Sequence, residues 1–154
     1  MRPGLPDLVV AALREAGLDG RCLEIEVTES MVMRDPEHVA DVLRQLRALG
    51  IRITVDDFGT GYSSLSYLKR FPIDCVKIDG AFIRDVPDDP DNVAITRGIV
   101  AMAHGLQLGV IAEGVENSEQ IRFLEQLGCD EVQGFAFSAP LPPAEAATRL
   151  PKGR

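Results

Sequence analysis

The chain has 154 residues, a net charge of −8 and an ordinary globular composition, with 45% hydrophobic and 26% charged residues. This length suits one domain with its own core, and the acidic balance argues against non-specific binding to DNA or to an acidic membrane surface. Three widely spaced cysteines without a C-x-x-C pair indicate reduced thiols, which favours a cytoplasmic protein. No apolar run is long enough for a membrane span, so we expect no membrane contact within this chain.

Helices and strands are expected to alternate along the whole chain, beginning with a helix over 6–16. The expected strands cover 23–28, 51–57, 75–79, 108–112 and 131–135. The expected helices that follow them cover 36–49, 64–70, 90–105, 118–127 and 143–150. This alternation predicts a parallel sheet with crossover helices, and it fits both an α/β barrel and an open doubly wound sheet.

The most informative stretch is the second strand, which is apolar and β-branched and ends in Asp56 and Asp57. Gly59 and Gly61 follow within four residues and permit a tight loop. In an α/β barrel, paired carboxylates at the carboxyl end of a strand typically form a metal or acid–base site. A solvated, Asp-rich turn is the alternative interpretation of the same residues.

Polar side chains recur near the carboxyl ends of all five expected strands. These residues are Glu26, Asp56 with Asp57, Lys77 with Asp79, Glu113, and Gln133. One strand that ends in a charge carries little information, but five in succession are typical of a barrel active site. No G-x-G-x-x-G follows a strand, so a dinucleotide-binding fold has no support.

Five ordered segments of this chain resemble the C-terminal part of the EAL domain, the cyclic-di-GMP phosphodiesterase family of bacteria. They are the E-x-T-E strand over 23–30, the D-D-F-G-T-G loop over 56–65, K-x-D over 77–79, A-E-G-V-E over 112–116, and Q-G-F over 133–135 with P-L-P over 140–142. The resemblance runs from about residue 5 to residue 150. Five specific motifs in the family's order are not expected to match by chance.

The resemblance implies a partial TIM-type (β/α) barrel with about five parallel strands and crossover helices. Family members begin further upstream, with the strand that carries the Glu-Ala-Leu motif and a later strand that carries an asparagine. Neither motif is in this sequence, so residues 1–154 are expected to be a single, N-terminally truncated EAL-like domain. Gly80-Ala81 also departs from the family, which more often has a longer polar residue after K-x-D.

The resemblance also implies hydrolysis of cyclic di-GMP to linear pGpG at a site for two Mg²⁺ or Mn²⁺ ions, which prefer oxygen ligands. Glu26 would bind the first metal, Asp56 would bridge both, and Asp57 would bind the second. Glu113 would bind the second metal or act as general base, and Lys77 would hold the attacking water.

A surrounding polar shell is implied for four further residues. Asp79 and Gln133 would complete the polar lining of the site. Glu29 would anchor the loop from Phe58 through Gly59, Thr60 and Gly61 to Tyr62. Glu116 would support the metal-binding and substrate-binding residues without touching metal or substrate itself. An exposed ion pair is the alternative for Lys77 with Asp79, and solvated strand ends explain Glu29 and Glu116 equally well.

Three hypotheses follow for the chain as a whole. The first is an EAL-type hydrolase whose metal site is incomplete, because the family's other Glu and Asn ligands are absent from the sequence. The second is a non-catalytic module that binds cyclic di-GMP or a protein partner. The third is a homodimer or swapped assembly, in which a second copy covers open sheet edges.

Overall fold

The computed structural model describes residues 4–32, 35–61 and 68–149, and its strands form one parallel sheet. The strands are β1 (Glu24–Thr28), β2 (Arg52–Phe58), β3 (Cys75–Ile78), β4 (Gly109–Ala112) and β5 (Glu131–Val132). They are neighbours in the order β1-β2-β3-β4-β5, which is also their order in the chain. A barrel has this order, whereas a doubly wound sheet reverses direction part-way. The predicted five-stranded parallel α/β architecture is confirmed.

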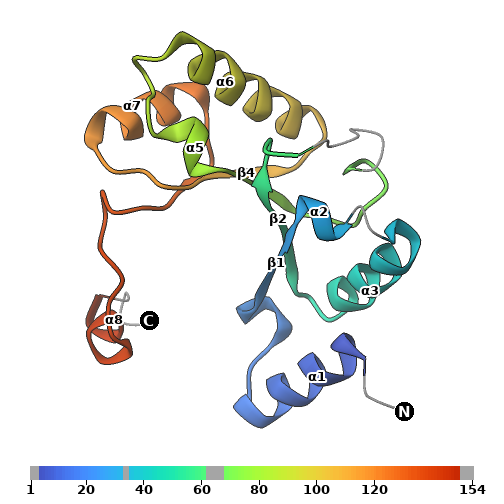
Figure 1. Ribbon diagram of the computed structural model, residues 1–154. Coiled ribbons are helices and arrows are strands. Elements are labelled where there is room, and N and C mark those ends of the chain that lie inside the picture. The colour runs from blue at the N-terminus through green and yellow to red at the C-terminus, as the bar shows by residue number, and fades with distance from the viewer. Residues whose placement is uncertain (1–3, 33–34, 62–67, 150–154) are drawn as a thin grey trace.

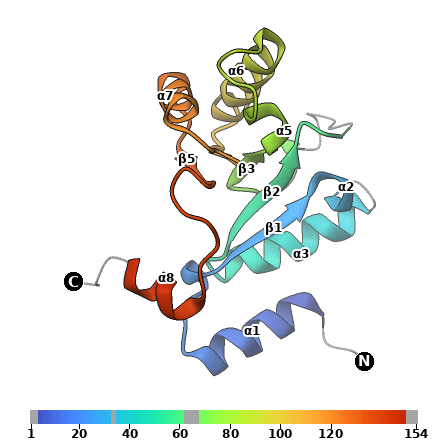
Figure 2. The same ribbon diagram turned by 60° about the vertical axis from the view of Figure 1, so that its left-hand side comes forward.

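Most helices flank the sheet, but the C-terminal helix lies away from it (Figures 1 and 2). The helices are α1 (Leu5–Ala16), the 3₁₀ helix η1 (Gly20–Cys22), α2 (Glu29–Val32), α3 (Pro36–Ala48), α5 (Gly80–Ile83), α6 (Pro90–Gly105), α7 (Ser118–Leu127) and α8 (Pro143–Arg149). Both views place α3 alongside β1 and β2, while α6 and α7 lie toward the β4 and β5 end of the sheet. No helix of the described residues is long and apolar enough to cross a membrane.

Local sequence signals set the ends of the long helices. The Asp35 side chain accepts a hydrogen bond from the backbone N–H of His38 and caps α3, which has Pro36 at its start. In α7, Asn117 and Gln120 form a reciprocal capping box, and Gly128 ends the helix in the left-handed conformation. These ends were therefore predictable from sequence.

The structure differs from the expected elements in three places. The four-residue helices α2 and α5 were not predicted, because one turn leaves no periodic pattern. The fifth strand was predicted to reach residue 135 but ends at Val132. The chain turns over 134–137, where the N–H of Phe137 donates to the carbonyl of Gly134. The expected helix over 64–70 falls largely outside the described residues.

The two faces of the sheet differ in chemistry. On the outer face, alternate residues of the central strands join the hydrophobic core that packs under the helices; they include Ile53, Val55, Val76, Ile78, Val110 and Ala112. The intervening residues face inward, and in β2 and β3 they are largely polar: Arg52, Thr54, Asp56, Cys75 and Lys77. The outer face therefore holds the fold together, and the inner face is available for chemistry.

Candidate active site

Lys77 gathers carboxylates from three strands at the carboxyl end of the sheet. Its side chain is 4% exposed, and its Nζ lies 2.8 Å from Glu26 Oε1 and 3.5 Å from Asp56 Oδ1. A third ion pair joins Nζ to Glu113 Oε1. The Gln133 side-chain amide donates to the same oxygen of Glu113 at 2.6 Å. Five of the residues predicted from strand ends are therefore one connected cluster.

The ionisation of Lys77 follows from these contacts. Burial by itself lowers the pKa of an ammonium, but hydrogen bonds to Glu113 and Glu26 and the charges of Glu113 and Asp56 outweigh it. The net effect raises the pKa of Lys77 above its ordinary value. Lys77 is therefore a fixed positive charge and not a proton shuttle near neutral pH.

Asp57 is placed differently from Asp56. It adopts φ 54°, the left-handed region, and its backbone N–H donates to Asp56 Oδ1 at 3.0 Å. Its carboxylate is exposed. Partial loss of hydration, together with the charges of Asp56 and Asp79, raises the pKa of Asp57. The charge of Lys77 opposes this effect only in part, so a further cation beside Asp57 would stabilise its ionised form.

Asp79 does not join the Lys77 cluster, although the strand pattern predicted that the two share a face. β3 ends at Ile78, and the Asp79 carboxylate accepts a hydrogen bond from the N–H of Ala81 at 2.7 Å, which caps α5. The unpredicted helix α5 thus explains its orientation. Asp79 still lies close enough to Asp57 to raise the pKa of that side chain.

Glu29 lies beneath the glycine loop. It is 8% exposed, and its Oε2 is a buried oxygen without a hydrogen-bond partner among the described residues. A Cβ built on Gly61 would stand 2.6 Å from Glu29 Oε1, so the loop backbone passes directly over this carboxylate. This position is compatible with the predicted anchoring role, which stays a prediction. Tyr62, at the far end of the predicted loop, lies outside the described residues.

The rest of the loop is fixed locally. Phe58 is buried, and the hydroxyl of Thr60 donates to the carbonyl of Asp57 at 2.8 Å. Gly59 has φ 98°, and a Cβ there would stand 2.9 Å from the ring of Phe82. A larger residue at this position would displace the ring or the loop.

Glu116 stands apart from the cluster. Its side chain is exposed, and its backbone N–H donates to Gln120 Oε1 at 2.7 Å. The contact serves the start of α7, so the structure offers no direct support for a role of the Glu116 carboxylate at the site.

The donor set suits a hard divalent cation, because Glu26, Asp56, Asp57 and Glu113 supply carboxylate oxygens at neighbouring strand ends. Within 4–32, 35–61 and 68–149, however, no three His, Cys, Asp or Glu side chains are already placed to hold one metal ion. Three of the four carboxylates instead contact Lys77. Holding an ion therefore requires these side chains to turn toward it, together with oxygen ligands from a substrate or from elsewhere.

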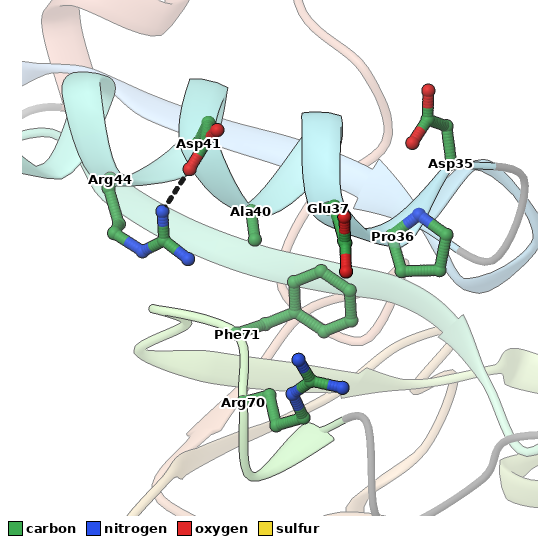
Figure 3. Close-up of a pocket in the computed structure, with 8 residues that line it drawn as sticks. All are labelled: Asp35, Pro36, Glu37, Ala40, Asp41, Arg44, Arg70 and Phe71. Atoms are coloured by element: carbon green, nitrogen blue, oxygen red, sulfur yellow. Dashed lines mark hydrogen bonds and ion pairs between the residues drawn. The ribbon is translucent and has the colours of Figure 1, made fainter.

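A cavity of about 540 Å³ lies on the outside of the sheet, between α3 and the segment before β3 (Figure 3). It is lined by acidic and basic side chains, including Glu37, Asp41, Arg44 and Arg70, around the ring of Phe71. None of its lining residues belongs to the Lys77 cluster. This cavity is therefore separate from the carboxylate cluster.

One inward-facing residue was missed by the sequence reasoning. Arg52 Nη2 lies 2.7 Å from Glu131 Oε1 on β5, and Nη1 lies 3.6 Å from Glu24 Oε2 on β1. The sequence shows only that Arg52 is a charged residue between the apolar residues Ile51 and Ile53. Its partners could not be predicted, because they lie 28 and 79 positions away in the chain.

The model of the EAL domain matches residues 1–140, which is most of the chain. The chain belongs to the EAL domain family. The signaling protein YkoW of Bacillus subtilis is 53% identical over 138 residues, covering 90% of this chain and 17% of that protein. The cyclic di-GMP phosphodiesterase NbdA of Pseudomonas aeruginosa is 48% identical over 141 residues, covering 92% and 18%. The chain thus spans less than a fifth of either relative.

Solved EAL structures share the fold. The PaMucR phosphodiesterase in complex with c-di-GMP is 46% identical with a TM-score of 0.89, over 94% of this chain and 59% of that one. The manganese and cyclic di-GMP complex of BlrP1 from Klebsiella pneumoniae is 38% identical with a TM-score of 0.80, over 87% and 34%. The TIM-barrel-like architecture is therefore that of the EAL domain, and the resemblance expected from the motifs is confirmed.

Proposed function

We propose that this EAL domain binds cyclic di-GMP together with divalent metal, Mg²⁺ or Mn²⁺, and acts in its hydrolysis to linear pGpG. One observation carries the proposal: a buried ammonium, Lys77, holds carboxylates of β1, of β2 and of the residue that follows β4, at the carboxyl end of the sheet. NbdA, PaMucR and BlrP1, all similar to this chain, carry cyclic di-GMP in their names or complexes.

The proposed metal ligands are Glu26, Asp56, Asp57 and Glu113. A divalent ion held there supplies Lewis-acid polarisation of a phosphate oxygen. Lys77 supplies a permanent positive charge next to the same carboxylates and orients the attacking water. Gln133 fixes one oxygen of Glu113, which leaves the other to bind metal or to accept a proton from that water.

The outer parts of the proposed site have supporting roles. Asp79 fixes the start of α5 beside Asp57, and Glu29 supports the loop of Phe58, Gly59, Thr60 and Gly61. Glu116 has the weakest support, because its carboxylate makes no contact with the cluster. We further propose that residues 1–154 act as one unit and work in the cytoplasm, where the free thiols of Cys22, Cys75 and Cys129 would stay reduced.

A non-catalytic, cyclic-di-GMP-binding module is the second candidate. It is favoured by the absence of a preformed group of three metal ligands in the described parts of the chain. For these 154 residues by themselves we expect binding to exceed turnover, since the family's Glu-Ala-Leu and Asn ligands are not among their motifs.

The test is a chromatographic time course of cyclic di-GMP with the purified chain and Mn²⁺, run beside equilibrium binding in Ca²⁺. Glu113→Gln is the site variant, and Glu125→Gln, on the exposed face of α7, is the matched control. Product or binding that is lost only in Glu113→Gln supports the proposal. Product distinguishes the enzyme from the binding module, and neither product nor binding in the unmodified chain overturns both.

A further inference from the structure

A second ionic cluster lies on the inner face of the sheet, around Arg52. Its guanidinium contacts Glu131 of β5 at 2.7 Å and Glu24 of β1 at 3.6 Å. Glu24 is also held by the hydroxyl of Thr54 at 2.5 Å. β2 and β5 are not neighbours, since β3 and β4 lie between them. The contact therefore crosses the inner face instead of joining adjacent strands.

Gly109 of β4 lies beside the path of the Arg52 side chain. A Cβ on Gly109 would stand 3.7 Å from Arg52 Nη2 and 3.3 Å from Cys75 Sγ. The guanidinium thus passes within van der Waals distance of the place that a Cβ at position 109 would occupy. A longer side chain at Gly109 would occupy the path from Arg52 to Glu131.

The same strands carry both ionic clusters. Glu24 precedes Glu26 by two residues, so the two share one face of β1. Gln133 follows Glu131 by two residues, just after the end of β5. Arg52 likewise shares the inner face of β2 with Asp56. Both clusters therefore draw side chains from β1 and β2, and Glu131 lies two residues before Gln133 of the Lys77 cluster.

Lys77 and Arg52 are complementary. Lys77 joins β3 to β1, β2 and β4, but none of its ion pairs reaches β5. Arg52 supplies that connection. β5 has only two residues and one neighbouring strand, so a contact across the sheet matters more to it than to a long central strand.

We infer that Arg52 is a positioning residue for the active site: by joining β5 to β2 and β1 past Gly109, it sets how closely Gln133 and Glu113 approach Glu26, Asp56 and Lys77. The inference rests on the proposed function only for its ligand-binding readout. Ordinary exposed ion pairs contribute little to stability, and a role limited to stability would leave the distant cluster unchanged.

The experiment uses a double-mutant cycle of Arg52→Gln and Glu131→Gln in the full 154-residue chain. Arg47→Gln is the matched control, because Arg47 forms a comparable ion pair with Asp74 at 2.9 Å without crossing the inner face. Arg52→Lys is a milder second variant that keeps the charge. Three readouts are taken: cyclic di-GMP affinity in Ca²⁺, urea unfolding, and the ¹⁵N ammonium signal of Lys77. The chain has only three lysines, so ¹⁵N-lysine labelling gives a simple spectrum.

We expect each single variant to weaken cyclic di-GMP binding about tenfold and the double variant to bind no more weakly than Arg52→Gln, because Arg52→Gln already removes the contact with Glu131. The Lys77 signal should shift or broaden in both. Arg52→Lys should recover part of the affinity, and Arg47→Gln should stay within about twofold of the unmodified chain.

Unchanged affinity and an unchanged Lys77 signal, with only lower stability, would overturn the inference, as would additive effects of the two substitutions. If the unmodified chain binds no cyclic di-GMP, the proposed function fails while the inference is still decided by Lys77. A Lys77 signal identical in all folded variants then overturns it, and a signal altered by Arg52→Gln and Glu131→Gln but not by Arg47→Gln supports it.

Discussion

Lys77 is a charged residue with almost no access to water, and the three carboxylates around it stabilise its charge in the folded protein. Lys77→Met removes the only ammonium of the cluster and leaves Glu26, Asp56 and Glu113 to repel one another. We expect the free energy of unfolding at pH 7 to fall by about 2–4 kcal/mol, near the lower end for a broken buried pair because Glu26 is 46% exposed. Urea unfolding measures the difference.

The stabilisation that Lys77 contributes should decrease at high pH. Because the folded-state pKa of Lys77 is raised, its stabilising contribution is complete below about pH 10.4, the ordinary lysine value, and is lost as the pH rises through the folded-state pKa. Lys69→Met, at an exposed position, is the control and should change stability by less than about 0.5 kcal/mol. Equal stability of Lys77→Met and the unmodified chain would contradict the described cluster.

Asp57 illustrates the opposite case, a carboxylate that the fold disfavours. Its raised pKa means that ionisation costs stability in the folded state, and this cost develops as the pH rises above about 3.9. Asp57→Asn removes the charge, and Asn tolerates the left-handed backbone. We expect this variant to be more stable at pH 7 by less than about 1 kcal/mol, since the group is exposed, and equally stable at pH 3.

The functional effect of Asp57→Asn should run against its effect on stability. Cyclic di-GMP binding in Ca²⁺ should weaken, because the proposal makes Asp57 a metal ligand. Parallel unfolding and binding measurements on one preparation test both statements. A variant that is less stable at pH 7 would contradict the electrostatic account, and one that binds cyclic di-GMP normally would remove Asp57 from the ligand set.

At the level of elements, the sequence predicted long, capped helices and buried strands well and short or turn-bounded elements poorly. Asp35 before Pro36 and Asn117 before α7 define helix starts through contacts three residues away. The end of β5 depends instead on Val115, which lies 18 positions before Gln133 and exchanges backbone hydrogen bonds with it and with Ala136. Such a long-range contact leaves no local pattern.

The same difference between local and long-range sequence signals applies to the candidate site. Glu26, Lys77, Glu113 and Gln133 were predictable, because strand ends of a parallel sheet meet at one edge. That Asp79 caps a helix was not, since a single helical turn has no periodicity.

Gly134 is the residue that fixes the turn after β5. It has φ 155°, and a Cβ there would stand 2.2 Å from the carbonyl oxygen of Val115. We expect Gly134→Ala to lower the free energy of unfolding by about 2–4 kcal/mol, because backbone atoms must move apart. Thermal and urea unfolding give the magnitude, and loss of cyclic di-GMP binding by the folded fraction would show that Gln133 has moved with the turn.

Gly98→Ala is the matched control for that substitution. Gly98 lies within α6, and a Cβ there would meet nothing within 4 Å. Alanine should therefore stabilise the chain by about 0.5–1 kcal/mol. If Gly134→Ala were as well tolerated as Gly98→Ala, this would contradict the close approach of Gly134 to the backbone of Val115.

At the scale of the whole molecule, the sheet of the described residues does not close on itself. β1 and β5 each have one neighbouring strand, and an unpaired strand edge favours association with another chain. Phe135 and Phe137, 68% and 54% exposed, add apolar surface just after β5. We therefore predict that the purified 154-residue chain forms a homodimer through these edges, which light scattering at micromolar concentration can detect.

The paired substitution Phe135→Ser with Phe137→Ser should shift this equilibrium toward monomer, because it removes apolar surface beside the β5 edge without touching the core. Leu18→Ser is the control, since Leu18 is similarly exposed at 54% but follows α1. Its dimer should persist. A monomer at every concentration would refute association through the edges, and equal loss of dimer in both variants would place the contact elsewhere. Since Gln133 lies two residues before Phe135, a dimer that binds cyclic di-GMP more tightly than the monomeric variant would connect assembly to the candidate site.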